Sequence, residues 1–130
     1  MPHTSIFTAD APKPIGTYSQ ALRANNMVFL AAQAPIHPQT MEVVRDDIAG
    51  QIRQVLENLS AVAKASGGSL ADAVKVTVYL TDLANFPLVN EAMKSYFKEP
   101  YPARASVGVK ELPRQTAVAI EAILVLPDGV

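Results

Sequence analysis

The chain has 130 residues, of which 49% are hydrophobic, so it can form one domain (1–130) around a hydrophobic core. Eleven Lys and Arg against twelve Asp and Glu leave a formal charge of -1, which argues against a dedicated nucleic-acid-binding protein. The absence of cysteine excludes disulfides, thiol catalysis and thiolate metal sites. The N-terminus is not signal-like, and no apolar run approaches the ~20 residues that cross a bilayer. Together these features predict a cytoplasmic protein.

The first part of the chain is expected to form strands. An edge strand is predicted at Ser5 to Thr8, ahead of a segment rich in Pro and Gly that favours an extended, irregular path. Residues 17–24 and 27–32 predict the two antiparallel strands of a hairpin. Its turn is Asn25-Asn26, because asparagine tolerates positive φ better than most residues.

The clearest helix is predicted over residues 46–66, where apolar side chains recur at helical spacing. Asp46 and Asp47 lie near its N-terminus, where the helix dipole favours negative charge. Gly67 and Gly68 follow and supply a C-terminal stop.

Strands and one more helix are predicted in the second half of the chain. Residues 73–81 alternate strictly between apolar and more polar side chains, which predicts a half-buried strand. A second helix is expected over about 85–97, with Pro87 allowed in its first turn. The segments 102–109 and 117–125 both have the composition of strands.

Each of these last two strands carries one charged residue where a buried strand should carry none. Arg104 shares a face with Ser106 and Gly108, whereas Glu121 lies on a face that is otherwise apolar. A direct hairpin with residues 111–114 as its loop would place Arg104 opposite Glu121. The pair has two interpretations: a structural ion pair, or a guanidinium that holds a small anionic substrate while the carboxylate handles protons.

The order of strands, helix, strand, helix and strands predicts an α+β domain. Two helices can cover one face of a sheet of five or six strands, and no further element remains for the other face. That second face carries Ala, Val, Ile, Thr and Tyr side chains. We therefore expect it to be buried against copies of the same chain in an oligomer.

Common metal, nucleophile and phosphate motifs do not occur in the sequence. His3 and His37 are the only histidines, and neither has the spacing of a metal-ligand pair, so no metal site is predicted. With no cysteine and no histidine beside an acid, a protease-like triad cannot be assembled from local pattern. Lys75 lies on an alternating strand and is interpreted as a solvated lysine rather than a Schiff-base residue.

Six segments, spread in order over nearly the whole chain, carry a resemblance to a known family. They are Ala-Pro-Lys-Pro-Ile-Gly-Thr-Tyr-Ser-Gln (11–20), Gln-Ala-Pro-Ile (33–36), Val-Thr-Val-Tyr-Leu-Thr-Asp-Leu (76–83), Pro-Ala-Arg-Ala-Ser-Val (102–107), Leu-Pro-Arg (112–114) and Ile-Glu-Ala (120–122). Together they resemble the reactive intermediate deaminase (Rid) family, also called YjgF or L-PSP, some of whose members were labelled translation inhibitors or endoribonucleases.

The resemblance implies a chorismate-mutase-like fold: a mixed, mostly antiparallel sheet of five to six strands with two helices on one face. It also implies a homotrimer in which the sheets meet around a central barrel and a cleft lies at each subunit boundary. In that fold the two C-terminal strands need not be neighbours, so the hairpin register stays open. The resemblance still implies that Arg104 and Glu121 share one pocket.

The activity that the resemblance implies is hydrolysis of reactive 2-imino/enamine acids, such as 2-iminobutanoate and 2-iminopropanoate, to 2-oxo acids and ammonia. Arg104 would bind the substrate carboxylate as a bidentate pair. Glu121 would position and deprotonate the attacking water and then help to protonate the departing ammonia. The residues implied to bind substrate are Tyr18, Ala32, Asn90 and Ser106. No cofactor is expected, because an iminium carbon is already electrophilic.

Four residues depart from the pattern of active members of the family. This chain has Ala31-Ala32 where they commonly have Ser-Gly, Ser106 where the family has cysteine, and Gly108 where they often have glutamate. If the family's glycine uses positive φ, Ala32 would cost about 1 kcal/mol.

Two alternative functions therefore remain beside the deaminase. One is a non-catalytic, regulatory module of the same fold that binds a small carboxylate or a partner protein. The other is an endoribonuclease or translation inhibitor, for which the balanced charge of the chain gives poor support.

Overall fold

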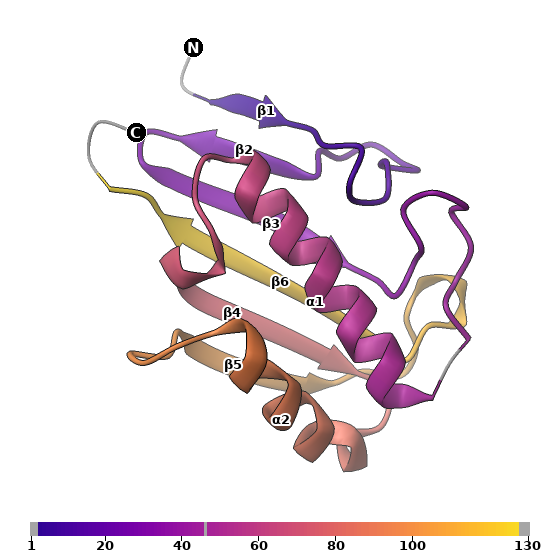
Figure 1. Cartoon of the computed structure of the whole chain (residues 1–130). Helices are drawn as coiled ribbons and strands as arrows, with labels where there is room; N and C mark the ends of the chain where they lie inside the picture. The colour runs from indigo at the N-terminus through magenta and orange to yellow at the C-terminus, as the bar shows by residue number, and fades with distance from the viewer. Residues whose placement is uncertain (1–2, 46, 128–130) are drawn as a thin grey trace.

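The computed structural model describes residues 3–45 and 47–127. Within them, six strands form one mixed sheet, and two α-helices pack together on one of its faces (Figure 1). The strands are β1 (Thr4–Ile6), β2 (Ala21–Ala24), β3 (Met27–Gln33), β4 (Ala73–Leu80), β5 (Ala103–Gly108) and β6 (Val118–Val125). The helices are α1 (Ile48–Ala65) and α2 (Phe86–Tyr96). The predicted α+β fold is confirmed.

The order of the strands in the sheet is β1-β2-β3-β6-β4-β5. All neighbours are antiparallel except β4 and β5, which are parallel because the chain returns through α2 between them. The predicted hairpin between the last two strands is therefore wrong, since β4 lies between β5 and β6. Arg104 pairs with Val76 of β4, and Glu121 pairs with Thr77 of β4 from the other side.

Local sequence signals explain where α1 begins and ends. The Asp47 side chain caps the helix by accepting a hydrogen bond from the Gly50 amide (2.8 Å), as its place near the N-terminus predicts. The second predicted acid, Asp46, lies outside the described residues. Gly67 ends the helix with a φ of 95°, a conformation that favours glycine. The predicted C-terminal stop is thus confirmed.

The α2 helix begins with Pro87 in its first turn, as expected. A 3₁₀ turn over Leu83–Asn85 precedes it, and the Asp82 side chain caps that turn by accepting a hydrogen bond from the Ala84 amide (2.9 Å). Val89 and Met93 are the buried side chains of α2. In the part of the chain that the structure describes, no helix is both long and apolar enough to span a membrane.

The core lies between the helices and one face of the sheet. The alternation predicted for β4 holds from Val76 to Leu80 but fails at Val74, which is 47% exposed, because the register shifts between Ala73 and Lys75. Fully buried side chains of β4, β6 and α1 meet in this layer: Val76, Val78, Leu80, Ile120, Leu124, Ile52, Val55, Leu56, Leu59 and Val62. The predicted strand 17–24 begins only at Ala21. Its first half is displaced because the buried Gln20 amide turns inward and donates to the carbonyls of Thr8, Ala11 and Pro12.

The other face of the sheet is apolar and uncovered, because both helices lie on the same side (Figure 1). Large apolar side chains on this open face are 36–44% exposed: Leu22, Met27, Phe29, Val107 and Val125. Their positions follow from the register, in which Leu22 pairs with Phe29 and Met27 with Val125. Among the described residues, no element packs over this face. Such a patch is typical of a surface that another molecule covers.

Candidate functional site

Glu121 is a half-buried carboxylate near the middle of the open face. Its Oε1 atom accepts a hydrogen bond of 2.6 Å from the Tyr79 hydroxyl of β4. That hydrogen bond is the main cause that raises the pKa of Tyr79 above 10.0, with burial and the negative charge of Glu121 acting in the same direction. The phenol therefore remains a donor at neutral pH.

A β-bulge lies directly across from Glu121. In the pairing of β3 with β6, Leu30 faces Ala122 and Gln33 faces Ile120, so Ala31 and Ala32 together oppose the single residue Glu121. Bulges leave a residue out of the regular ladder and often occur beside functional sites.

The backbone of the bulge does not carry the strain considered for Ala32. The described non-glycine residues with positive φ are Asn25, Met41, Arg114 and Gln115, which do not include Ala32. The cost of about 1 kcal/mol therefore does not arise.

Glu121 and Tyr79 border a cavity of about 560 Å³ on the open face. Most of its lining is apolar, and it includes Ile15, Ala34, Ile36, Leu112, Pro113 and Ala119. Tyr18 and Ala32, two of the predicted substrate-binding residues, also line it. The structure thus brings three predicted site residues together: Glu121, Tyr18 and Ala32. A carboxylate beside apolar walls suits a small substrate that needs proton transfer.

Arg104 lies in a different place, at the edge strand β5. Its Nη1 atom donates to Asn90 Oδ1 of α2 (3.0 Å), and its guanidinium carbon lies 4.7 Å from the centroid of the Phe86 ring. Arg104 and Asn90 line a second cavity of about 330 Å³. Ser106 is the next residue on the same side of β5 and is exposed. The second group of predicted site residues is therefore Arg104, Asn90 and Ser106.

The two groups lie on opposite faces of the sheet within one chain. Arg104 is in register with Val76, which points toward the helices, whereas Glu121 is in register with the next residue, Thr77, which points to the open face. A pocket shared by Arg104 and Glu121 therefore requires a second copy of the chain. The shared pocket stays a prediction for the assembled protein.

Two residues of the cavity escaped the sequence analysis. Tyr79 belongs to the predicted strand 73–81 and to the family-like segment 76–83, but nothing in its own sequence context shows that it reaches Glu121. Arg114 lines the same cavity, has a φ of 58° and donates from Nη1 to the Met41 carbonyl (3.0 Å). The motif Leu112-Pro113-Arg114 was the only sequence signal for it.

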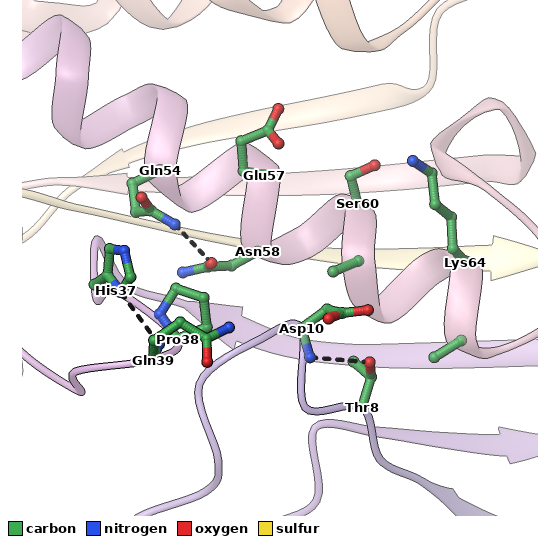
Figure 2. A pocket seen from close by; sticks show the side chains of 12 residues that line it. Thr8, Asp10, His37, Pro38, Gln39, Gln54, Glu57, Asn58, Ser60 and Lys64 are labelled. Carbon is green, nitrogen blue, oxygen red and sulfur yellow. Dashed lines mark hydrogen bonds between the residues drawn. The ribbon is translucent and has the colours of Figure 1, made fainter.

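A larger cavity of about 630 Å³ lies between α1 and the loops that precede it (Figure 2). Its buried amide, Asn58, donates to the carbonyls of Ala34 and Ile36 and accepts from Gln54 (Figure 2 shows the last bond). His37 lies in the loop and accepts hydrogen bonds from the amides of Gln39 and Thr40 at Nδ1. Asn58 and His37 thus hold the loop in place, and the Glu121 cavity is the stronger candidate for chemistry.

The chain is similar in sequence to known proteins over nearly its whole length. A family model described as Endoribonuclease L-PSP matches residues 8–126. A RutC family protein of Pyrococcus horikoshii is 53% identical over 118 residues, which cover 91% of this chain and 94% of the relative. A 2-iminobutanoate/2-iminopropanoate deaminase of Dermatophagoides farinae is 42% identical over 125 residues, covering 96% of this chain and 98% of the relative.

A solved structure shows the same fold. The crystal structure of RidA from the Antarctic bacterium Psychrobacter sp. PAMC 21119 superposes with a TM-score of 0.91 at 45% sequence identity. The match covers 95% of this chain and 99% of that protein.

Proposed function

Because the chain belongs to the Endoribonuclease L-PSP family, which includes the YjgF, RutC and Rid proteins, we propose that it is a deaminase for reactive 2-imino acids. Its products would be 2-oxo acids and ammonia, with 2-iminobutanoate and 2-iminopropanoate as substrates. One observation carries the proposal: a carboxylate, Glu121, is held by a phenol beside a mostly apolar cavity of about 560 Å³. A relative named as a deaminase of these two imines supports the choice of substrate.

Glu121 acts on the water molecule that attacks the imine carbon. As the oxygen of water bonds to carbon, Glu121 takes one proton from it, and a tetrahedral carbinolamine forms. Glu121 then gives that proton to the nitrogen and takes the proton of the hydroxyl as the C–N bond breaks and the carbonyl forms. Ammonia accepts this last proton and leaves as ammonium. The electrophile is the protonated imine itself, so the protein mainly aligns water, proton and substrate.

Arg104 binds the substrate carboxylate. Asn90 accepts a hydrogen bond from the Nη1 atom of Arg104, and the Phe86 ring lies beside the guanidinium. The Arg104 side chain is therefore oriented before substrate arrives. The Nη2 and Nε donors are directed to the two carboxylate oxygens as a bidentate pair. Ser106, on the same side of β5, lies within the same part of the site.

The complete site forms between two subunits. One subunit supplies Glu121, Tyr18 and Ala32 from its open face, and its neighbour supplies Arg104, Asn90 and Ser106 from the edge strand β5. A homotrimer, with one site at each boundary, accounts for both the uncovered apolar face and the separation of the two groups. The lack of cysteine accords with a reducing compartment, and we place the protein in the cytoplasm.

The proposal is tested by coupling the protein to a threonine dehydratase and measuring the release of 2-oxobutanoate. The wild type should accelerate release over buffer. Arg104→Ala should lower kcat/KM roughly 100- to 10,000-fold, because a hydrogen bond to a charged group contributes about 1.5–3 kcal/mol and two are lost. Arg53→Ala, an exposed arginine of α1, is the matched control and should leave the rate unchanged. A folded oligomer that gives no acceleration would refute the deaminase.

A second function is favoured by the mostly apolar lining of the cavity, where Ala31 and Ala32 supply no side-chain donor. In this case the protein binds a small carboxylate without turnover. It would retain a 2-oxo acid in equilibrium dialysis and lose that binding in Arg104→Ala, while imine hydrolysis stays at the buffer rate. An RNA-directed activity has less support, because the formal charge is -1.

A further inference from the structure

Tyr79 and Glu121 come from neighbouring strands and meet on the open face. The Cα partner of Glu121 in β4 is Thr77, and Tyr79 is the next residue of β4 on that face. The long phenol side chain reaches diagonally across the pair of strands, and its hydroxyl donates to Oε1 of Glu121 at 2.6 Å. Both side chains are half-buried and both line the 560 Å³ cavity.

We propose that Tyr79 is a positioning residue that fixes the carboxylate of Glu121 for catalysis. By donating to Oε1, the phenol holds one oxygen against β4 and leaves Oε2 for the attacking water. This inference rests on the proposed deaminase function and assigns a role in it to a residue that acts through Glu121.

The surroundings of Glu121 make this single hydrogen bond important. Its neighbours on the open face of β6 are Ala119 and Ile123, and the bulge across from it presents Ala31 and Ala32. None of these side chains has a donor. Among the described residues, Tyr79 is the hydrogen-bond partner of the Glu121 carboxylate. Without the phenol, the carboxylate could rotate away from the water, and alignment of the reacting groups would be lost.

Tyr79 holds its proton while it performs this role. The hydrogen bond to Glu121, burial and the nearby negative charge all raise its pKa above 10.0. The phenol is therefore a donor throughout the neutral pH range and does not compete with Glu121 as a base. Its contribution is to geometry rather than to proton transfer.

The chain contains a matched control for this interaction. Tyr96 of α2 donates to Glu57 Oε2 of α1 at 2.5 Å, so the same two residue types form the same bond away from the Glu121 cavity. Removing the Tyr96 hydroxyl tests what the loss of a Tyr–Glu hydrogen bond does to the protein in general. Removing the Tyr79 hydroxyl tests what it does at the site.

The experiment compares Tyr79→Phe, Tyr96→Phe, Glu121→Gln and the Tyr79→Phe/Glu121→Gln double variant in the imine hydrolysis assay. Tyr79→Phe should lower kcat roughly tenfold or more while KM stays within about twofold, because binding survives and alignment does not. Tyr96→Phe should keep the wild-type kcat. In the Glu121→Gln background, Tyr79→Phe should cause no further loss, since the phenol then has no catalytic carboxylate to orient.

Three outcomes would overturn the inference. If Tyr79→Phe keeps the wild-type kcat, or if its effect is equally large in the Glu121→Gln background, Tyr79 does not act through Glu121. If Tyr79→Phe raises KM and leaves kcat unchanged, it contributes to binding and not to positioning. The failure of the function itself looks different: the wild type would then hydrolyse no imine, and every variant would behave like buffer.

Discussion

Each side of the sheet holds a tyrosine that donates to a glutamate, and the surroundings of the two pairs differ. Tyr96 and Glu57 join α2 to α1 on the helix side, whereas Tyr79 and Glu121 join β4 to β6 on the open face. Burial is the main cause that raises the pKa of Tyr96 to about 12. For Tyr79, the hydrogen bond to the glutamate is the main cause.

The difference shows how one interaction can serve two purposes. Between the helices, Tyr96 is partly buried against the core, and its exposed bond to Glu57 adds to an interface that burial already holds together. On the open face, the half-buried phenol owes its raised pKa first to the hydrogen bond, and that bond orients Glu121. Changing the two pairs in turn distinguishes a structural contact from an arrangement that prepares chemistry.

The largest difference between the pairs is expected when each glutamate is neutralised. Glu121→Gln should lower kcat roughly 100- to 10,000-fold, because the amide cannot accept the proton of water. Glu57→Gln should keep kcat within about twofold. The measurement is the initial rate of imine hydrolysis at saturating substrate, with the oligomeric state of each variant checked by light scattering. Equal rates for the two variants would remove Glu121 from the mechanism.

The second difference concerns the surfaces around the pairs. Phe29 is 44% exposed on the open face, and Leu88 is 43% exposed on α2. If copies of the chain cover the open face, Phe29→Lys places an unpaired charge in that interface and should shift the protein to a smaller mass. Leu88→Lys should keep the wild-type mass. Sedimentation at several concentrations measures both, and an unchanged mass for Phe29→Lys would show that the open face is not the interface.

The elements of the fold were predictable because their signals are local. The spacing of apolar residues over 46–66 and 85–97 gave the helices, and strict alternation over 73–81 gave the strand between them. The face assignments within each strand were also right: Arg104 lies away from Ala105, and Glu121 lies away from Ile120. The face to which each side chain of a strand points depends only on the backbone of that strand.

The relation between strands could not be predicted in the same way. Nothing local shows that β4 lies between β5 and β6, because this depends on a crossover through α2 that only the folded chain reveals. Tyr79 was missed for the same reason, since its partner is 42 residues away in sequence. The candidate site was therefore predicted as a set of residues, while its division between the two faces of the sheet was not.

The smallest expected effect is on stability at high pH, and it arises from Tyr96. Its pKa is 10.0 as an ordinary tyrosine and about 12 in the folded chain, so the folded state holds the proton more tightly. Between these values the unfolded state loses the proton first, so the free energy of unfolding falls as pH rises from about 10 to 12. Tyr96→Phe should remove this part of the slope, measured by urea unfolding at fixed pH values. Glu57→Gln should only reduce this slope, because burial, the main cause of the pKa shift, remains. If Glu57→Gln instead abolishes the slope, the hydrogen bond is the main cause of the shift in Tyr96, as it is in Tyr79.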